Sequence, residues 1–172
     1  AWLTAFTGSA GAAVVLADKA AIFVDGRYTL QLARQTDTAL FAPQELVPDG
    51  PAAWIGEYLK SGAKLGYDPW LHSVNAVAGL KAAAERAGGA LTACETNPLD
   101  AVWTGRPAPP AARAMPDALD LAGEPAQAKR ERIAAAMQKA GADAAVLNLA
   151  ESICWLLNIR GGDVPPTPFV LC

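Results

Sequence analysis

Short apolar runs alternate with segments of helical periodicity through the first part of the chain. Five segments have the compact apolar pattern of a buried strand: residues 12–16, 20–24, 39–42, 64–67 and 90–94. The first two are joined by a short polar turn, which is typical of a β-hairpin. Three segments carry the pattern of a helix: residues 28–37, 51–59 and 73–87. This alternation predicts an α/β domain in which helices pack on a sheet.

A proline-rich stretch interrupts the pattern after Arg106. It contains five prolines at positions 107, 109, 110, 116 and 125. Proline fixes φ and lacks a backbone donor, so this stretch is predicted to contain neither a regular helix nor a central strand. We interpret it as an interdomain linker. The chain is therefore predicted to hold a first domain over 1–106, a linker over 107–125 and the beginning of a second domain over 126–172.

The predicted second domain has its own elements. Helices are predicted over residues 126–140 and 151–158, and strands over residues 144–149 and 168–172. Residues 2–8 and 155–161 share the pattern W-L-x-x-(F/I)-x-G. If this match is not chance, the chain holds two copies of one α/β unit, and Trp2 and Trp155 occupy equivalent positions against their own sheets.

Composition and charge exclude several classes of protein. The chain is 52% apolar and 18% charged, which excludes a disordered protein, and its net charge of −3 argues against nucleic-acid or anionic-lipid partners. It has no run of eighteen apolar residues that would span a membrane. The start lacks Met and a basic segment, so it is expected to be a cut rather than a natural start. The three scattered cysteines favour a reducing, cytoplasmic location.

Catalytic chemistry has little support in this sequence. His72 is the single histidine, so a His-containing metal site or a Ser-His-Asp site would have to use it. It lies on a predicted loop, where a surface or capping role is the simpler reading. No phosphate-binding loop is present. We therefore expect no catalytic residue and no metal ligand in this chain.

Two arginines are the candidate substrate-binding residues. Arg27 and Arg160 each stand beside a glycine at the end of a structured segment. Arginine presents five donors in a rigid fork that suits a carboxylate. The alternative is local pairing, for which Asp25 and Asp163 are the nearest partners in sequence.

Several motifs occur in an order that resembles one family. They are F-T-G-S-A-G at residues 6–11, D-G-R-Y at 25–28, L-G-Y-D-P at 65–69, V-W-T-G-R-P at 102–107 and W-L-L-N-I-R-G-G-D-V at 155–164. Together they resemble the front part of Xaa-Pro aminopeptidases of the creatinase/prolidase type, in the longer, three-domain branch. The resemblance covers essentially the whole chain.

The resemblance implies a mixed β-sheet flanked by helices in a creatinase/prolidase N-terminal-type domain, followed by part of a second similar domain. It also implies a parent enzyme that removes an N-terminal residue preceding proline. That chemistry would use two divalent metal ions, usually manganese, in a third domain outside this chain. The present part would shape the active-site entrance and the domain or subunit contacts of a cytoplasmic homodimer, and would be inactive alone. The alternatives are a catalytically inactive peptidase-like binding module and a related Xaa-Pro dipeptidase or creatinase.

Overall fold

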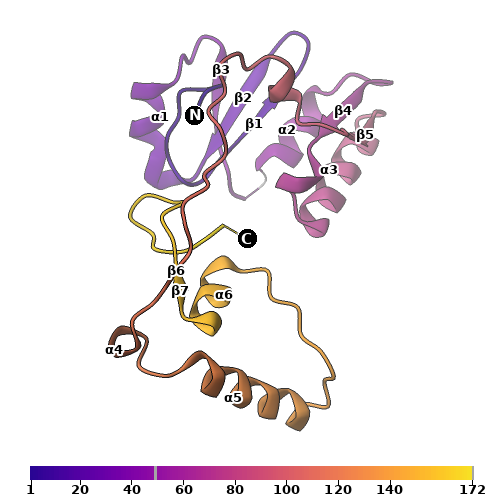
Figure 1. The fold of residues 1–172 in the computed structure, drawn as a ribbon. Helices are drawn as coiled ribbons and strands as arrows, with labels where there is room; N and C mark the ends of the chain where they lie inside the picture. The colour runs from indigo at the N-terminus through magenta and orange to yellow at the C-terminus, as the bar shows by residue number, and fades with distance from the viewer. Residues whose placement is uncertain (49, 172) are drawn as a thin grey trace. The chain divides into compact units, whose positions relative to one another are not determined.

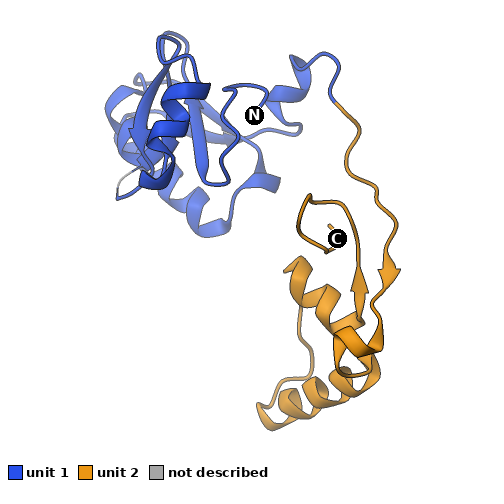
Figure 2. Ribbon diagram, turned by 90° about the vertical axis from the view of Figure 1, so that its left-hand side faces the viewer, with its two compact units in different colours: residues 1–106 blue, residues 107–172 orange. Residues whose placement is uncertain are grey.

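The computed structural model describes residues 1–48 and 50–171. The chain divides into two compact units, unit 1 over residues 1–106 and unit 2 over residues 107–172 (Figure 2). Each unit is described by itself. No helix within the described ranges is both long enough and apolar enough to cross a bilayer.

Unit 1 is built around a three-stranded mixed sheet (Figure 1). Strands β1 (Gly11–Val15) and β2 (Ala20–Val24) form the expected antiparallel hairpin, and β3 (Phe41–Glu45) pairs with β2 in parallel. The central strand β2 is apolar throughout, and four of its five residues are buried. A strand covered on both faces reads as such a continuous apolar run.

A second, two-stranded sheet of unit 1 contains β4 (Lys64–Tyr67) and β5 (Ala90–Ala93), which are parallel. Helix α3 (Val74–Arg86) connects them. It begins where the hydroxyl of Ser73 accepts a hydrogen bond from the backbone N–H of Ala76, and it is followed by Gly88 at φ 77°. Ser is a preferred N-cap, and glycine adopts the left-handed conformation at little cost.

The remaining helical elements of unit 1 are α1 (Thr29–Gln35), α2 (Gly50–Tyr58) and three short 3-10 turns, η1 (Gly26–Tyr28), η2 (Pro69–Leu71) and η3 (Pro98–Ala101). Two apolar clusters form its core. The larger joins β1 and β2 to α2 and α3 through Val14, Phe23, Trp54, Ile55 and Ala83, among others. The smaller contains Phe6, Ile22, Val24, Leu32 and Phe41. The predicted mixed-sheet α/β fold is thus confirmed.

Unit 2 consists of β6 (Met115–Pro116), α4 (Leu119–Ala122), α5 (Ala126–Lys139), α6 (Ala150–Leu157) and β7 (Ile159–Arg160). Strands β6 and β7 are antiparallel. The two longer helices confirm the predictions for 126–140 and 151–158. The prediction that the stretch 107–125 contains no regular helix is wrong, because α4 forms in the part between Pro116 and Pro125 that has no proline. Strand β6 also lies in this stretch and pairs with β7 alone among the described strands.

Two predicted strands of unit 2 are wrong. Residues 144–149 have no regular secondary structure, and Val146 is 94% exposed. Residues 168–171 form no strand either, and Cys172 lies outside the described residues. A strand needs hydrogen-bonding partners on a neighbouring strand. Among the described residues no neighbouring strand supplies them to these two segments.

The two W-L-x-x-(F/I)-x-G segments share one backbone feature. Their fourth residues, Ala5 and Asn158, both have positive φ, at 58° and 52°. The tryptophan surroundings differ, however, and the expectation that they are equivalent is wrong. Trp2 stacks on Trp103 with ring centroids 5.3 Å apart, whereas the Trp155 ring lies 4.6 Å from the ammonium of Lys129. The backbone turn is repeated and the side-chain environment is not.

Candidate functional site

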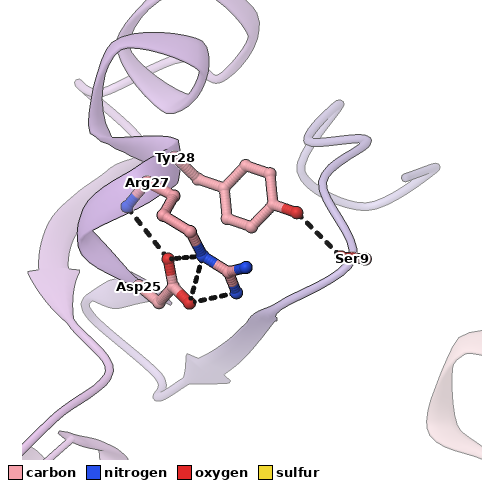
Figure 3. Close-up of polar contacts among 4 residues, drawn as sticks. All are labelled: Ser9, Asp25, Arg27 and Tyr28. Atoms are coloured by element: carbon pink, nitrogen blue, oxygen red, sulfur yellow. Dashed lines mark hydrogen bonds and ion pairs between the residues drawn. The ribbon is translucent and has the colours of Figure 1, made fainter.

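The D-G-R-Y motif forms the turn that follows the buried strand β2. Asp25 caps the 3-10 turn η1, and its Oδ1 accepts the backbone N–H of Arg27 at 2.9 Å (Figure 3). An Asp in this position stabilises a turn by replacing a missing main-chain acceptor. The motif is therefore explained locally by chain reversal at the end of a central strand.

The Asp25 carboxylate also holds the Arg27 side chain. The Nε atom of Arg27 donates to both carboxylate oxygens at 3.0 Å, and Nη2 donates to Oδ2 at 2.6 Å. This hydrogen-bonded ion pair lowers the pKa of Asp25 and raises that of Arg27. The Arg27 side chain is nevertheless 73% exposed, and no residue in the described ranges bonds its Nη1.

The F-T-G-S-A-G segment lies against this turn. The hydroxyls of Ser9 and Tyr28 share a hydrogen bond of 2.8 Å, as Figure 3 shows. The rings of Phe6 and Tyr28 meet edge to face, with centroids 5.7 Å apart. Two of the motifs that carried the resemblance thus lie together in one site of unit 1.

Glycine at two positions of this segment makes room for the Phe6 ring. A Cβ atom added at Gly8 would lie 2.2 Å from Cζ of Phe6, and one added at Gly11 would lie 3.0 Å from Cε1. The phenyl ring is itself buried. Its close approach to the backbone explains the spacing of the glycines.

Arg160 of unit 2 has a different environment. It lies on β7, and its Nη1 donates to Oδ1 of Asp117 at 3.5 Å. This contact is long, and it is the one ion pair that Arg160 makes with a described residue. The sequence pointed to Asp163 as the nearest candidate for pairing with Arg160, and that expectation is wrong. The Asp163 carboxylate instead accepts the backbone N–H groups of Ala112 and Leu171 at 2.8 and 3.0 Å.

Lys129 supports the turn that precedes Arg160, a role that the sequence did not reveal. Its side chain is buried, at 2% exposure. The Nζ atom donates to the carbonyl of Trp155 at 3.0 Å and to Oδ1 of Asn158 at 2.6 Å. A cation at a helix C-terminus stabilises the last carbonyls, which have no partner within the helix. A lysine inside a helical pattern gives no sign that it is buried.

Metal-binding side chains do not converge in the part of the chain that the structure describes. No group of three His, Cys, Asp or Glu side chains there lies close enough to hold a metal ion. The imidazole Nδ1 of His72 lies 2.9 Å from the carbonyl of Asp68, and its ring meets that of Tyr67 edge to face. His72 thus serves the structure of a turn, and the described residues offer no ligand set into which a metal would fit.

Comparison with known families gives two adjacent matches. A family model described as the Creatinase/Prolidase N-terminal domain matches residues 1–102, and a second model with the same description matches residues 105–172. The resemblance seen in the sequence motifs is confirmed by these matches. The two models divide between residues 102 and 105, a few residues before the boundary of unit 1 and unit 2 after Arg106.

Curated relatives and a solved structure agree with the family matches. The chain is 36% identical over 172 residues to Aminopeptidase P2 of Arabidopsis thaliana, covering 98% of the chain and 24% of the relative. It is 32% identical to the Probable Xaa-Pro aminopeptidase P of Ajellomyces dermatitidis, covering 97% of the chain and 28% of the relative. The chain thus spans about a quarter of the length of these relatives.

The solved structure is that of X-prolyl aminopeptidase from Caenorhabditis elegans, described as a cytosolic enzyme with a di-nuclear active site. The present chain matches it with a TM-score of 0.85 and 30% sequence identity. The match covers 98% of this chain and 28% of that protein.

Proposed function

Because the chain belongs to the creatinase/prolidase N-terminal domain family, we propose that it forms the non-catalytic front part of an Xaa-Pro aminopeptidase. The parent enzyme would remove an N-terminal residue that precedes proline. The observation that carries this proposal is the match to the C. elegans X-prolyl aminopeptidase along 98% of the chain. In this proposal the chain shapes the entrance of an active site that the rest of the protein completes.

The metal chemistry is proposed to reside outside residues 1–172. The di-nuclear site belongs to the C. elegans enzyme, of which this chain matches 28%. Two divalent ions, for which manganese is our expectation, would activate the attacking hydroxide and polarise the scissile carbonyl. We also propose a cytoplasmic homodimer for the full-length protein. The residues of this chain would contribute binding and contact surfaces.

Arg160 is the stronger of the two substrate-binding candidates, because its acidic partner binds fewer of its guanidinium nitrogens. Asp25 already holds two nitrogens of the Arg27 guanidinium, whereas Arg160 makes a single 3.5 Å contact with Asp117 among the described residues. The loosely held fork of Arg160 suits the carboxylate of a bound peptide. Arg27 would contribute through Nη1, which points away from the pair with Asp25.

The proposed function is tested with the full-length protein and the peptide Arg-Pro-Pro. We expect manganese-dependent release of free arginine that a chelator abolishes, and no release by the 172-residue chain. Release by the 172-residue chain that a chelator removes would refute the non-catalytic assignment. No release by a folded, metal-loaded full-length protein would instead favour a catalytically inactive binding module.

The same assay separates the two roles of Arg160. We expect Arg160→Ala to raise KM or lower kcat at an unchanged melting temperature, because the peptide contact is lost and Asp117 is exposed enough to remain solvated. The matched control is Asp117→Asn, which removes the partner and keeps the arginine. A lower melting temperature with unchanged kinetics of the folded fraction would assign Arg160 to structure alone.

A further inference from the structure

Lys129 of α5 is the one buried cation among the described residues. No carboxylate of the described residues forms an ion pair with it. A lysine is almost never fully buried unless it is paired. Removal of an ammonium from water costs free energy, and an apolar side chain of similar volume is often at least as stabilising in such a place. Stability alone therefore does not explain a lysine at this position.

The partners of the Lys129 ammonium all lie at the end of α6. Its Nζ atom donates to the carbonyl of Trp155 at 3.0 Å and to Oδ1 of Asn158 at 2.6 Å. The same atom lies 4.6 Å from the centroid of the Trp155 ring. An ammonium has three N–H donors and no acceptor, so these three partners match its whole capacity.

Asn158 links this ammonium to the strand that carries Arg160. Its backbone is left-handed, at φ 52° and ψ 51°, and its carbonyl accepts the N–H of Asp117 at 2.7 Å. Strand β7 begins at the next residue, and Asp117 is the ion-pair partner of Arg160. The conformation of Asn158 therefore fixes the backbone on both sides of the contact between Arg160 and Asp117.

We propose that Lys129 is a positioning residue, which holds Asn158 in its left-handed turn and so sets the direction in which Arg160 meets a bound peptide. This inference rests on the proposed substrate role of Arg160. Lys129 itself is too deeply buried to touch the peptide. Without the ammonium, Oδ1 of Asn158 loses its partner and the turn loses support. Even a small displacement of a substrate-positioning group lowers catalytic efficiency by a large factor.

The competing role for Lys129 is stabilisation of the α6 C-terminus alone. A basic side chain in that role bonds the last main-chain carbonyls of the helix. Here the shorter of the two bonds goes instead to the side-chain oxygen of Asn158, at 2.6 Å against 3.0 Å for the carbonyl of Trp155. That preference for the residue two positions before Arg160 favours the positioning role.

A double-mutant cycle in the metal-loaded, full-length protein tests the proposal, with Arg-Pro-Pro as substrate. Lys129→Met keeps the length of the side chain and removes its donors, and should lower kcat/KM about 10-fold. In the Arg160→Ala background the same change should lower it less than about 2-fold, because the group that Lys129 positions is absent. In the Arg27→Ala background the loss should stay at about 10-fold. Lys139→Met, at an exposed position of the same helix, is the matched control and should have wild-type kinetics.

The melting temperature of each variant separates positioning from structure. A lower melting temperature of Lys129→Met with wild-type kinetics of the folded fraction would overturn the proposal. An equal loss of kcat/KM with and without Arg160 would also overturn it. If Lys129→Met does not fold, Lys129→Arg, which keeps the charge and the donors, is read in the same backgrounds. Its loss of kcat/KM should be smaller and should vanish in Arg160→Ala, and a loss that persists there would overturn the proposal.

Peptide binding makes the test independent of turnover. If the wild-type protein releases no arginine, the proposed enzymatic function fails, and the same cycle is read from dissociation constants of Arg-Pro-Pro measured by calorimetry. Weaker binding by Lys129→Met that disappears in the Arg160→Ala background would then still support the positioning role. Wild-type affinity of Arg160→Ala, or no binding by the wild type, would overturn it.

Discussion

The Asp25 carboxylate does two things at once in the turn after β2. It accepts a backbone N–H that closes the turn, and it binds two nitrogens of the Arg27 guanidinium. The arginine side chain is therefore held in one orientation although most of it is exposed. A fixed, exposed guanidinium loses less conformational entropy on meeting a partner than a freely rotating one. In the proposed substrate role of Arg27, Nη1 is the guanidinium nitrogen left for the contact.

The Asp25–Arg27 pair should give a measurable pH dependence. The pKa of Asp25 is lowered in the folded protein. The pair therefore contributes its full stabilisation at pH values above about 3.9, the pKa of an Asp carboxyl in the unfolded chain. That contribution is lost as the pH falls through the lower, folded pKa. We expect Arg27→Met to raise the pKa of Asp25 toward its usual value in an NMR titration. An unchanged pKa of Asp25 in the variant would mean that the ion pair does not form in solution.

At the scale of elements, the end of α6 depends on side chains from elsewhere in unit 2. Asn158 ends the helix at φ 52°, a conformation that is rare for a residue with a side chain. Its amide donates to the carbonyl of Glu124 at 2.8 Å and its Oδ1 accepts from Lys129 at 2.6 Å. The start of α5 and the end of α6 are thus joined at one residue, directly before Arg160.

Substitution of Asn158 separates the backbone contribution from the side-chain contribution. Asn158→Gly keeps the left-handed turn and loses both hydrogen bonds, one of them from a buried ammonium, which should destabilise unit 2 by roughly 2–4 kcal/mol. Asn158→Ala should cost about 1 kcal/mol more than Asn158→Gly, because positive φ is energetically unfavourable for alanine. Urea unfolding followed by the NMR signals of α6 measures both. Equal stability of wild type and Asn158→Gly would show that the side-chain bonds contribute nothing.

The sequence predicted elements well where the pattern is local. Helix α5 was predicted because its helix-forming residues and the following Gly141 lie in one continuous segment. The strand over residues 144–149 was not formed, because a strand depends on partners that a local pattern cannot reveal. The contact of Arg160 with Asp117 spans 43 residues, and the burial of Lys129 depends on tertiary packing. These parts of the site therefore required the structure.

At the scale of the whole molecule, the two units differ in how they are held together. Almost all buried apolar residues lie in unit 1, and Cys154 is the one described exception. The described buried residues of unit 2 otherwise are Lys129 and Asp163, which act through hydrogen bonds. Burial of apolar surface is the main source of stability. Unit 1 therefore has an apolar core with which to fold by itself, whereas unit 2 buries only one apolar residue among those described.

Separate expression of the units tests this difference. The fragment 1–106 should unfold cooperatively, with a melting temperature within about 4 °C of the unit 1 transition in the 172-residue chain, since both of its apolar clusters lie within it. The fragment 107–172 should show few protected amides and no sharp thermal transition. The idea fails if 1–106 is unfolded or if 107–172 melts cooperatively.

The Phe6 ring that lies across Gly8 and Gly11 has a consequence for how this segment can vary among proteins. A methyl group at position 8 would overlap the ring, so the glycine is required only while the ring is present. The two positions are therefore coupled, and a change at one should be accepted mainly when the other changes with it. Ser9 and Thr7 point to polar partners instead, and their tolerance is set by hydrogen bonding. Substitutions in this segment are thus limited in two independent ways, by side-chain volume at residues 6, 8 and 11 and by hydrogen bonding at residues 7 and 9.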